Sequence, residues 1–525
     1  MQLVAYGAQD VYLTGNPQIT FWKVTYRRHT NFAMESIEQT FNGQADFGRR
    51  VQCTVSRNGD LAYRTYLQVT LPEINQSSDA GDVYARWLDC PGEQLVQMVE
   101  VEIGGQRIDR QYGDWMHIWN QLTLTSEQED GYNKMIGNTT QLTYLCDPAF
   151  AEVATACGGA NVPEAVCAPR KALPETTLYV PLQFWYCRNP GLALPLIALQ
   201  YHEVKINIEL RPLDECLWAV NEITSGNSDS VKANGAYSKS LVAASLYVDY
   251  IFLDTDERRR MAQNPHEYLI EQLQYTGEES IGSSSNKVKL NFNHPCKELV
   301  WVVQPDANVS YCDSFVTGEV LNAALGAQPF NYTDAVDALP NSIRAFSGHS
   351  QLGSTNNSVI DASGLFADRT AGDISENAAH GGDLSGTFKA GDQSGVSDAG
   401  AFVLAETALK MHCWGENPVV TAKLQLNGQD RFSEREGTYF DLVQPYQHHT
   451  RHPDTGINVY SFALRPEEHQ PSGTCNFSRI DNAVLQLVVS AAAIGGSSTA
   501  KVRVYATNYN VLRVMSGMGG LAYSN

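Results

Sequence analysis

Alternation of apolar and polar side chains with a period of two is the feature that most restricts what this chain can fold into. In Leu61–Leu71 the odd-numbered residues are apolar or threonine, whereas the even-numbered ones include Arg64 and Gln68. The pattern returns in Val204–Leu210, at 288–292 and at 422–426. Such segments are typical of antiparallel strands with one buried face, and turn residues separate them along the whole chain. We therefore predict an all-β fold.

The length of 525 residues is too great for one ordinary core, so several domains are expected. A helical pattern is predicted mainly after Asp254, where a charge-rich run precedes Pro265. A short helix followed by proline near the middle of the chain is typical of a connection between domains. We interpret residues 254–264 as a short helical linker.

An internal repeat agrees with this division. Residues 99–107 form a strand-like run with a Gly-Gln turn, and an aromatic pair around Tyr112 and Trp115 follows; residues 421–431 and the pair Tyr439-Phe440 repeat that order. We predict two copies of one β domain, residues 28–253 and 265–525, preceded by an N-terminal arm, residues 1–27.

Long loop insertions are predicted within both copies. Residues 305–400 contain 12 Gly, 12 Ser and 12 acidic residues against 3 basic ones, so we expect a long, solvated surface excursion there. Smaller insertions are predicted around 123–175 and 221–240.

Charge and cysteine usage restrict the partners and the compartment. The net charge of −21 repels the phosphate backbone of nucleic acids, so no direct specific nucleic-acid binding is expected. The N-terminus lacks the basic and apolar blocks of a secretory signal, which predicts a protein that is intracellular where it is made. Eleven cysteines without a CxxC pair indicate a reducing compartment, although Cys157 and Cys167 could pair on oxidation.

Motifs for enzymatic chemistry are missing from the sequence. It contains no P-loop, HExxH or nucleophile elbow, so we predict no enzyme, no cofactor and no catalytic residue. The GxGxxA match at 517–522 has no helix after it and is expected to be a mobile tail. The cluster of His448, His449 and His452 could bind a metal or form a loop or subunit contact, and the latter is favoured because Pro453 marks a turn.

Two sets of residues are candidates for surface contacts or modification. The first is a basic and aromatic cluster near the N-terminus, suited either to phosphate or lipid head groups or simply to water: Lys23, Tyr26, Arg27, Arg28 and His29. The second is three Asn-x-Ser/Thr sites in or near the long excursion, which are candidates for glycosylation: Asn308, Asn331 and Asn356.

Several long segments of the sequence, taken in order, resemble the major capsid proteins of large nucleocytoplasmic DNA viruses. They include residues 3–21, residues 26–32, Ser56-Arg57-Asn58-Gly59-Asp60-Leu61, Pro181-Leu182-Gln183-Phe184-Trp185-Tyr186, residues 192–204, and the stretch from Leu426-Asn427-Gly428-Gln429 to residues 509–513. The resemblance spans nearly the whole chain apart from the long loops.

That resemblance implies two consecutive eight-stranded jelly-roll β-sandwiches and a homotrimer with six-fold pseudo-symmetry. The trimers would be capsomers that tile an icosahedral virion, assembled in the host cytoplasm next to minor capsid and penton proteins. The arm would lie at the capsomer base, near an internal membrane, and the 305–400 excursion would help form the outward tower.

Two other functions fit the same sequence. One is a double jelly-roll scaffold that shapes a viral membrane and is absent from the mature particle. The other is a β-sandwich carbohydrate-binding protein or glycosidase, which the unpaired cysteines and the missing signal disfavour.

Overall fold

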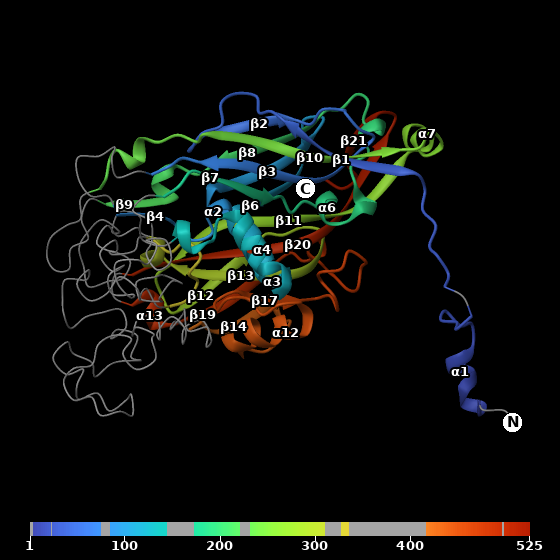
Figure 1. Ribbon diagram of the computed structural model, residues 1–525. Helices are drawn as coiled ribbons and strands as arrows, with labels where there is room; N and C mark the ends of the chain where they lie inside the picture. The colour runs from blue at the N-terminus through green and yellow to red at the C-terminus, as the bar shows by residue number, and fades with distance from the viewer. Residues whose placement is uncertain are drawn as a thin grey trace, which may run out of the picture.

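The computed structural model describes residues 4–22, 24–74, 84–143, 173–220, 232–309, 327–334, 416–495 and 498–524. Within them the chain forms two β-sandwiches that lie side by side, and an N-terminal arm extends away from both (Figure 1). Most of the 305–400 excursion, and Cys157 and Cys167, lie outside the described residues.

The first sandwich consists of two four-stranded antiparallel sheets, with the strand orders β1-β10-β3-β7 and β2-β8-β5-β6. Its strands are β1 (Phe32–Gln39), β2 (Arg50–Thr54), β3 (Leu61–Leu71), β5 (Val96–Ile103), β6 (Gln106–Tyr112), β7 (Thr176–Pro181), β8 (Val204–Leu210) and β10 (Ala243–Leu253). A separate two-stranded sheet pairs β4 (Tyr84–Trp87) with β9 (Leu217–Val220).

The second sandwich repeats this topology, with the orders β11-β20-β13-β17 and β12-β19-β14-β15. Its strands are β11 (His266–Ile281), β12 (Ser285–Leu290), β13 (Pro295–Pro305), β14 (Val419–Leu426), β15 (Gln429–Asp430), β17 (Asn458–Ser461), β19 (Ala483–Val489) and β20 (Ala500–Met515). Three short strands extend these sheets: β16 (Arg435–Glu436), β18 (Cys475–Asn476) and β21 (Met518–Leu521). The predicted double jelly roll is thereby confirmed.

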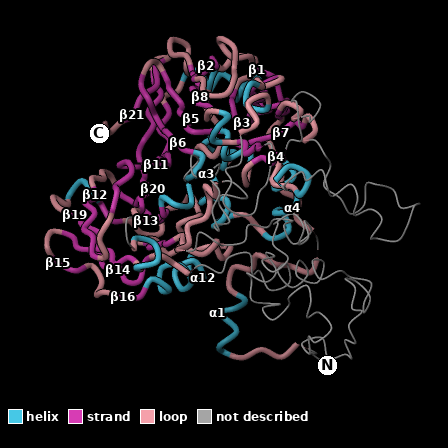
Figure 2. Tube along the Cα trace, turned by 90° about the vertical axis from the view of Figure 1, so that its left-hand side faces the viewer, coloured by secondary structure: helices cyan, strands magenta, loops and turns pink. Residues whose placement is uncertain are grey.

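The alternation seen in the sequence explains how each sandwich closes. In β3 the odd-numbered side chains are buried, while the even-numbered ones beyond Tyr63 are exposed or half-buried. Each sandwich fills the space between its sheets with its own apolar cluster, around Val69 and Ile206 in the first and around Trp301 and Leu485 in the second. Figure 2 shows the first sandwich above the second, with β6 and β11 between them.

The internal repeat corresponds to one hairpin in each sandwich. The turn between β5 and β6 places Gly104 and Gly105 at φ 58° and 86°, and the turn between β14 and β15 places Asn427 and Gly428 at φ 52° and 80°. Two consecutive positive φ angles define the tight turn that suits the twist of a hairpin.

Two helices of eleven residues were not predicted: α3 (Gly113–Thr123) and α4 (Ser126–Ile136). α3 has no simple apolar stripe, because Met116 faces the first core while Trp115 and Trp119 face the second sandwich. The shorter helices include α2 (Pro91–Leu95), α6 (Trp185–Arg188), α12 (Gln444–His448) and α13 (Ala491–Ile494). α7 (Thr255–Gln263) lies in the predicted linker.

The expected mobile tail at 517–522 was wrong. β21 pairs with β20, and Gly519 N donates to Nδ1 of the His202 imidazole of the first sandwich at 3.1 Å. Tyr201 N also donates to Gly517 O at 2.9 Å. Glycine serves here as a site of close backbone approach, because a Cβ on Gly517 would lie 2.5 Å from the Tyr201 ring.

Candidate assembly surfaces

The two sandwiches meet along an apolar surface built by α3, here named the interdomain seam. Trp115, Ile118, Trp119 and Leu122 of α3 pack against the outer face of the sheet β11-β20-β13-β17. The rings of Trp115 and Tyr505 are 5.3 Å apart. Burial of these large side chains stabilises the contact between the sandwiches, because it removes apolar area from water.

Polar contacts fix the register of the seam. The edge strand β6 of the first sandwich faces the edge strand β11 of the second: Gln272 Nε2 donates to Ile108 O, and Leu273 N donates to Asp109 Oδ1 at 3.1 Å. Burial raises the pKa of Asp109 to about 7, although hydrogen bonds oppose that shift.

A buried ionic cluster continues the seam around Glu271 of β11. Its carboxylate accepts from Arg188 of the first sandwich at 3.2 Å and from Lys297 at 2.7 Å, and the His469 ring lies 3.3 Å away. Burial alone would raise the pKa of Glu271, but the bond to His469 and the charges of Lys297 and Arg188 lower it to about 2. Glu271 is therefore ionised at neutral pH and joins both sandwiches.

A second buried cluster surrounds Glu93 of α2. Its carboxylate accepts from Tyr132 at 2.5 Å and Asn120 at 3.1 Å, and lies 2.7 Å from His117 Nδ1. Within the described ranges, Cys90, Glu93 and His117 are the one group of three metal-ligating side chains whose ligand atoms all lie within 4.8 Å. Sequence reasoning missed this group, because His117 stands on a different helix. The hydrogen bonds already occupy both Glu93 oxygens, so the cluster is explained as a structural hub.

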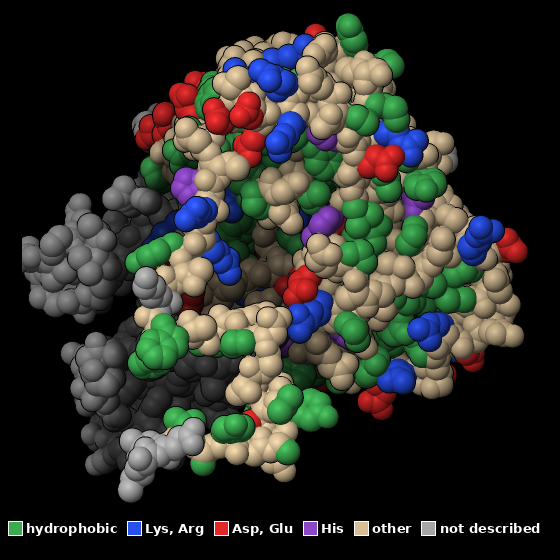
Figure 3. Space-filling model, turned by 90° about the vertical axis from the view of Figure 1, so that its right-hand side faces the viewer, with side chains coloured by type: hydrophobic (Ala, Val, Ile, Leu, Met, Phe, Trp, Pro, Cys, Tyr) green, Lys and Arg blue, Asp and Glu red, His purple; other side chains and the backbone are tan. Residues whose placement is uncertain are grey.

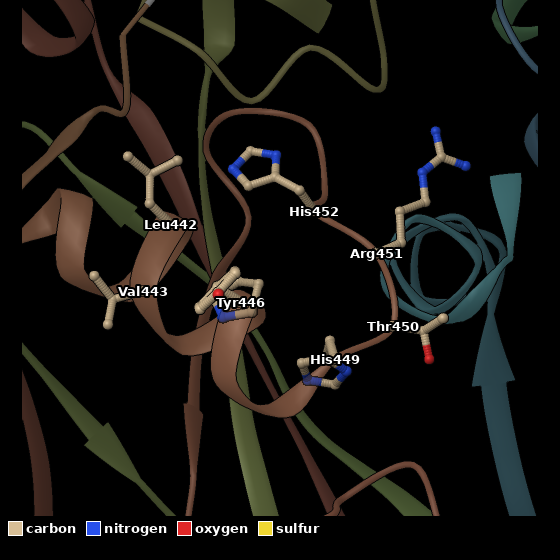
Figure 4. Close-up of a pocket in the computed structure, with 8 residues that line it drawn as sticks. Leu442, Val443, Tyr446, His449, Thr450, Arg451 and His452 are labelled. Atoms are coloured by element: carbon tan, nitrogen blue, oxygen red, sulfur yellow. The ribbon is translucent and has the colours of Figure 1, made fainter.

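The histidine cluster lies at the end of α12, and the His449 and His452 rings lie apart and do not point toward each other (Figure 4). His449 is buried between two carboxylates, with Nε2 2.9 Å from Glu298 and Nδ1 2.9 Å from Glu467. His448 Nδ1 instead lies 3.1 Å from Leu464 O. Burial opposes protonation of His449, but the Glu298 and Glu467 carboxylates raise its pKa to about 9. Both ring nitrogens of His449 are engaged, which favours the loop or subunit contact over metal binding at this residue.

The surface beside His449 is hollowed. Leu442, Val443, Tyr446, Arg451 and His452 line a hollow of about 480 Å³ together with His449 (Figure 4). Leu442, Val443 and Tyr446 are exposed apolar side chains, which is unusual for three neighbours on one short helical segment.

The N-terminal arm carries the predicted basic cluster. Tyr26, Arg27, Arg28 and His29 are exposed, and Lys23 lies outside the described residues. Exposed apolar side chains line the same arm, including Phe21 and Trp22. Figure 3 shows hydrophobic side chains along the arm, and Figure 1 shows that the arm extends away from the sandwiches. None of the arm residues that the structure describes is buried, so these residues add nothing to either core.

The glycosylation candidates differ in their surroundings. Asn308 is buried, and its Nδ2 donates to Asn331 O at 2.9 Å and to Thr333 O at 3.3 Å. Asn331 is half-buried and donates to Gln328 Oε1 at 2.8 Å. Asn356 lies outside the described residues. A sugar on Asn308 would therefore have to displace two buried hydrogen bonds.

The cysteines whose bonding state the structure gives are free thiols: Cys53, Cys90, Cys187, Cys216, Cys296 and Cys475. Among the described residues, no helix combines the length and the apolar character that crossing a membrane requires.

The two sandwiches, their shared strand order and the helix-built seam define a double jelly-roll protein. The family described as large eukaryotic DNA virus major capsid protein matches residues 257–520, and the family described as major capsid protein N-terminus matches residues 20–254. The chain belongs to the major capsid proteins of large eukaryotic DNA viruses, and it is a structural protein rather than an enzyme.

Relatives and solved structures agree with this assignment. The chain is 77% identical over 525 residues to the major capsid protein of Phaeocystis pouchetii virus, covering 100% of this chain and 99% of the relative. It is 40% identical over 547 residues to that of Paramecium bursaria Chlorella virus 1, with 100% and 99% coverage. The PBCV-1 virus capsid structure matches with a TM-score of 0.61 at 34% identity, covering 96% and 100%. The Faustovirus major capsid protein, at 13% identity and a TM-score of 0.62 over 97% and 94%, supports the fold alone.

Proposed function

We propose that three copies of this chain form a pseudo-hexameric capsomer and that such capsomers tile an icosahedral shell. The observation that carries this proposal is the duplication: one chain contains two jelly rolls with the same strand order. Three such chains around a three-fold axis present six similar sides, which neighbouring capsomers in a flat array can contact in nearly equivalent ways.

The division into an arm (residues 1–27), a first jelly roll (28–253), a linker (254–264) and a second jelly roll (265–525) is part of this proposal. The family matches support it, because one ends at residue 254 and the other begins at residue 257. The long 305–400 excursion of the second copy then belongs to the outward tower.

The arm is proposed to contact minor capsid or penton proteins and the internal membrane at the capsomer base. The exposed aromatic side chains of the arm and its cations Lys23, Arg27 and Arg28 support this proposal. Aromatic side chains suit the apolar part of a membrane surface, and cations suit its anionic head groups. Free thiols support assembly in the reducing host cytoplasm. Glycosylation at Asn308, Asn331 and Asn356 stays a prediction, and intact mass before and after glycosidase treatment tests it.

Images of the purified protein by electron microscopy test the capsomer directly. We expect six-lobed particles with three-fold symmetry. Particles with two lobes, one per jelly roll, would contradict the proposal, because they would be single chains.

A further inference from the structure

The helical segment after the second hairpin is the counterpart of α3. Residues 437–447 follow β16 as residues 113–123 follow β6, and Gly437 packs on the first residue of β14 as Gly113 packs on the first residue of β5. Three positions further, Met116 is buried in the first core and Phe440 in the second. The two segments therefore sit on their own sandwiches in the same orientation.

Their outward faces differ sharply in exposure. In α3, Ile118, Trp119 and Leu122 are 0%, 7% and 0% exposed, because the second sandwich covers them. The equivalent side chains of η13 (Tyr439–Val443) and α12 are Leu442, Val443 and Tyr446, which are 45%, 38% and 87% exposed. We name these three residues the docking helix face. It has the apolar character of the seam, but no sheet among the described residues covers it.

The surface that α3 covers also has a counterpart. On the second sandwich, α3 packs against Tyr505 of β20. Tyr505 pairs with Val300 of the neighbouring strand β13. In the first sandwich β10 and β3 hold the same places in the strand order, and Tyr247 of β10 pairs there with Tyr66 of β3.

On the first sandwich the rings at this position are partly exposed. The Tyr66 and Tyr247 rings stack at 5.2 Å, the Tyr66 and Tyr179 rings meet at 6.1 Å, and all three are half-buried or exposed. We name Tyr66, Tyr179 and Tyr247 the tyrosine face. A patch of aromatic rings on the outer side of a sheet is an apolar surface that another element can cover.

We propose that the docking helix face of one copy packs on the tyrosine face of a second copy, repeating between chains the contact that α3 makes within the chain. This inference rests on the proposed trimer and names its interface. One chain cannot close the contact on itself, because α12 and the sheet β1-β10-β3-β7 lie at opposite ends of the molecule (Figures 1 and 2). The contact is head-to-tail, so successive copies form a ring when the rotation closes.

Single substitutions test the interface by the mass of the particle in solution. Tyr446→Asp places a charge on the docking helix face, and Tyr247→Asp places one on the tyrosine face. We expect light scattering to give three times 57.8 kDa for the unchanged protein and 57.8 kDa for each variant. Tyr201→Asp is the matched control, since Tyr201 is 76% exposed on a loop outside both faces, and it should keep the mass of three chains.

Mixing the two variants tests the head-to-tail geometry. Chains with Tyr446→Asp retain an intact tyrosine face, and chains with Tyr247→Asp retain an intact docking helix face, so the mixture should give twice 57.8 kDa. A mixture that stays at the mass of one chain would overturn the arrangement. If Tyr247→Asp does not fold, as judged by its thermal transition, the more exposed Tyr179→Asp takes its place.

The outcomes separate the two proposals. Trimers that persist in both variants overturn the docking contact and leave the capsomer standing. An unchanged protein that has the mass of one chain overturns both.

Discussion

His449 and Glu298 form a buried ion pair in the second jelly roll, with Nε2 and Oε2 2.9 Å apart and both side chains fully buried. Glu467 holds the other ring nitrogen, so the imidazolium joins β13 to the loop after α12. Breaking such a pair leaves an uncompensated carboxylate in the interior.

The first prediction concerns this pair. The pKa of His449 is raised from 6.5 to about 9 on folding, so its contribution to stability is full below pH 6.5 and declines as the pH rises through 9. His449→Gln should lower the free energy of unfolding at pH 6 by about 3–5 kcal/mol and should remove that alkaline decline. Denaturant unfolding at pH 6, 8 and 10 measures both effects. His448→Gln changes the half-buried neighbour, which has no carboxylate partner among the described contacts, and as the control it should change stability by less than about 0.5 kcal/mol.

The second prediction concerns Glu271 at the interdomain seam. Its pKa falls from 4.5 to about 2 on folding, so the stability it provides is full above pH 4.5 and is lost as the pH falls through 2. Glu271→Gln should destabilise the protein at pH 7 by about 3 kcal/mol and flatten its acid denaturation. Glu267→Gln on the same strand removes an exposed pair with Arg513 and should cost less than about 1 kcal/mol. Equal losses in the two variants would contradict the role given to the buried cluster.

The third prediction uses the paired glycines of the repeat. A Cβ on Gly113 would lie 2.1 Å from Val96 O, and one on Gly437 would lie 1.8 Å from Val419 O. Each alanine variant should lose about 1–3 kcal/mol, because the backbone must move to make room. Gly131→Ala in α4 meets no atom within 4 Å and should stabilise the helix by about 0.5–1 kcal/mol. Thermal unfolding of the three variants ranks them, and unchanged stability in Gly437→Ala would refute the equivalence.

Much of this fold follows from the sequence. The period-2 pattern located β3 and β8 to the residue, and the Gly-Gln turns located the hairpin that both jelly rolls share. The alternation is informative because each strand buries one face. The positions of the apolar residues therefore show which side chains of a strand point into the core.

The seam and the helices were less accessible to sequence reasoning. α3 buries apolar side chains on two sides, so its pattern lacks the single stripe by which a helix is recognised. The partners of Glu271 and His449 come from positions up to 198 residues away along the chain, which no local pattern can bring together. The docking helix face differs from α3 in exposure and not in residue type, so the sequence alone does not distinguish the two segments.

The fourth prediction concerns the arm. Deleting residues 1–28 should leave the thermal transition of the two jelly rolls unchanged, because no residue of the arm that the structure describes is buried. Assembly into larger arrays should weaken, which sedimentation of the assembled material measures. A lost cooperative transition would mean that the arm supports a core instead.

The mass of the purified protein in solution tests the central claim most directly. The account predicts a single species of three times 57.8 kDa by light scattering at neutral pH. A species of 57.8 kDa at the same concentration would contradict it.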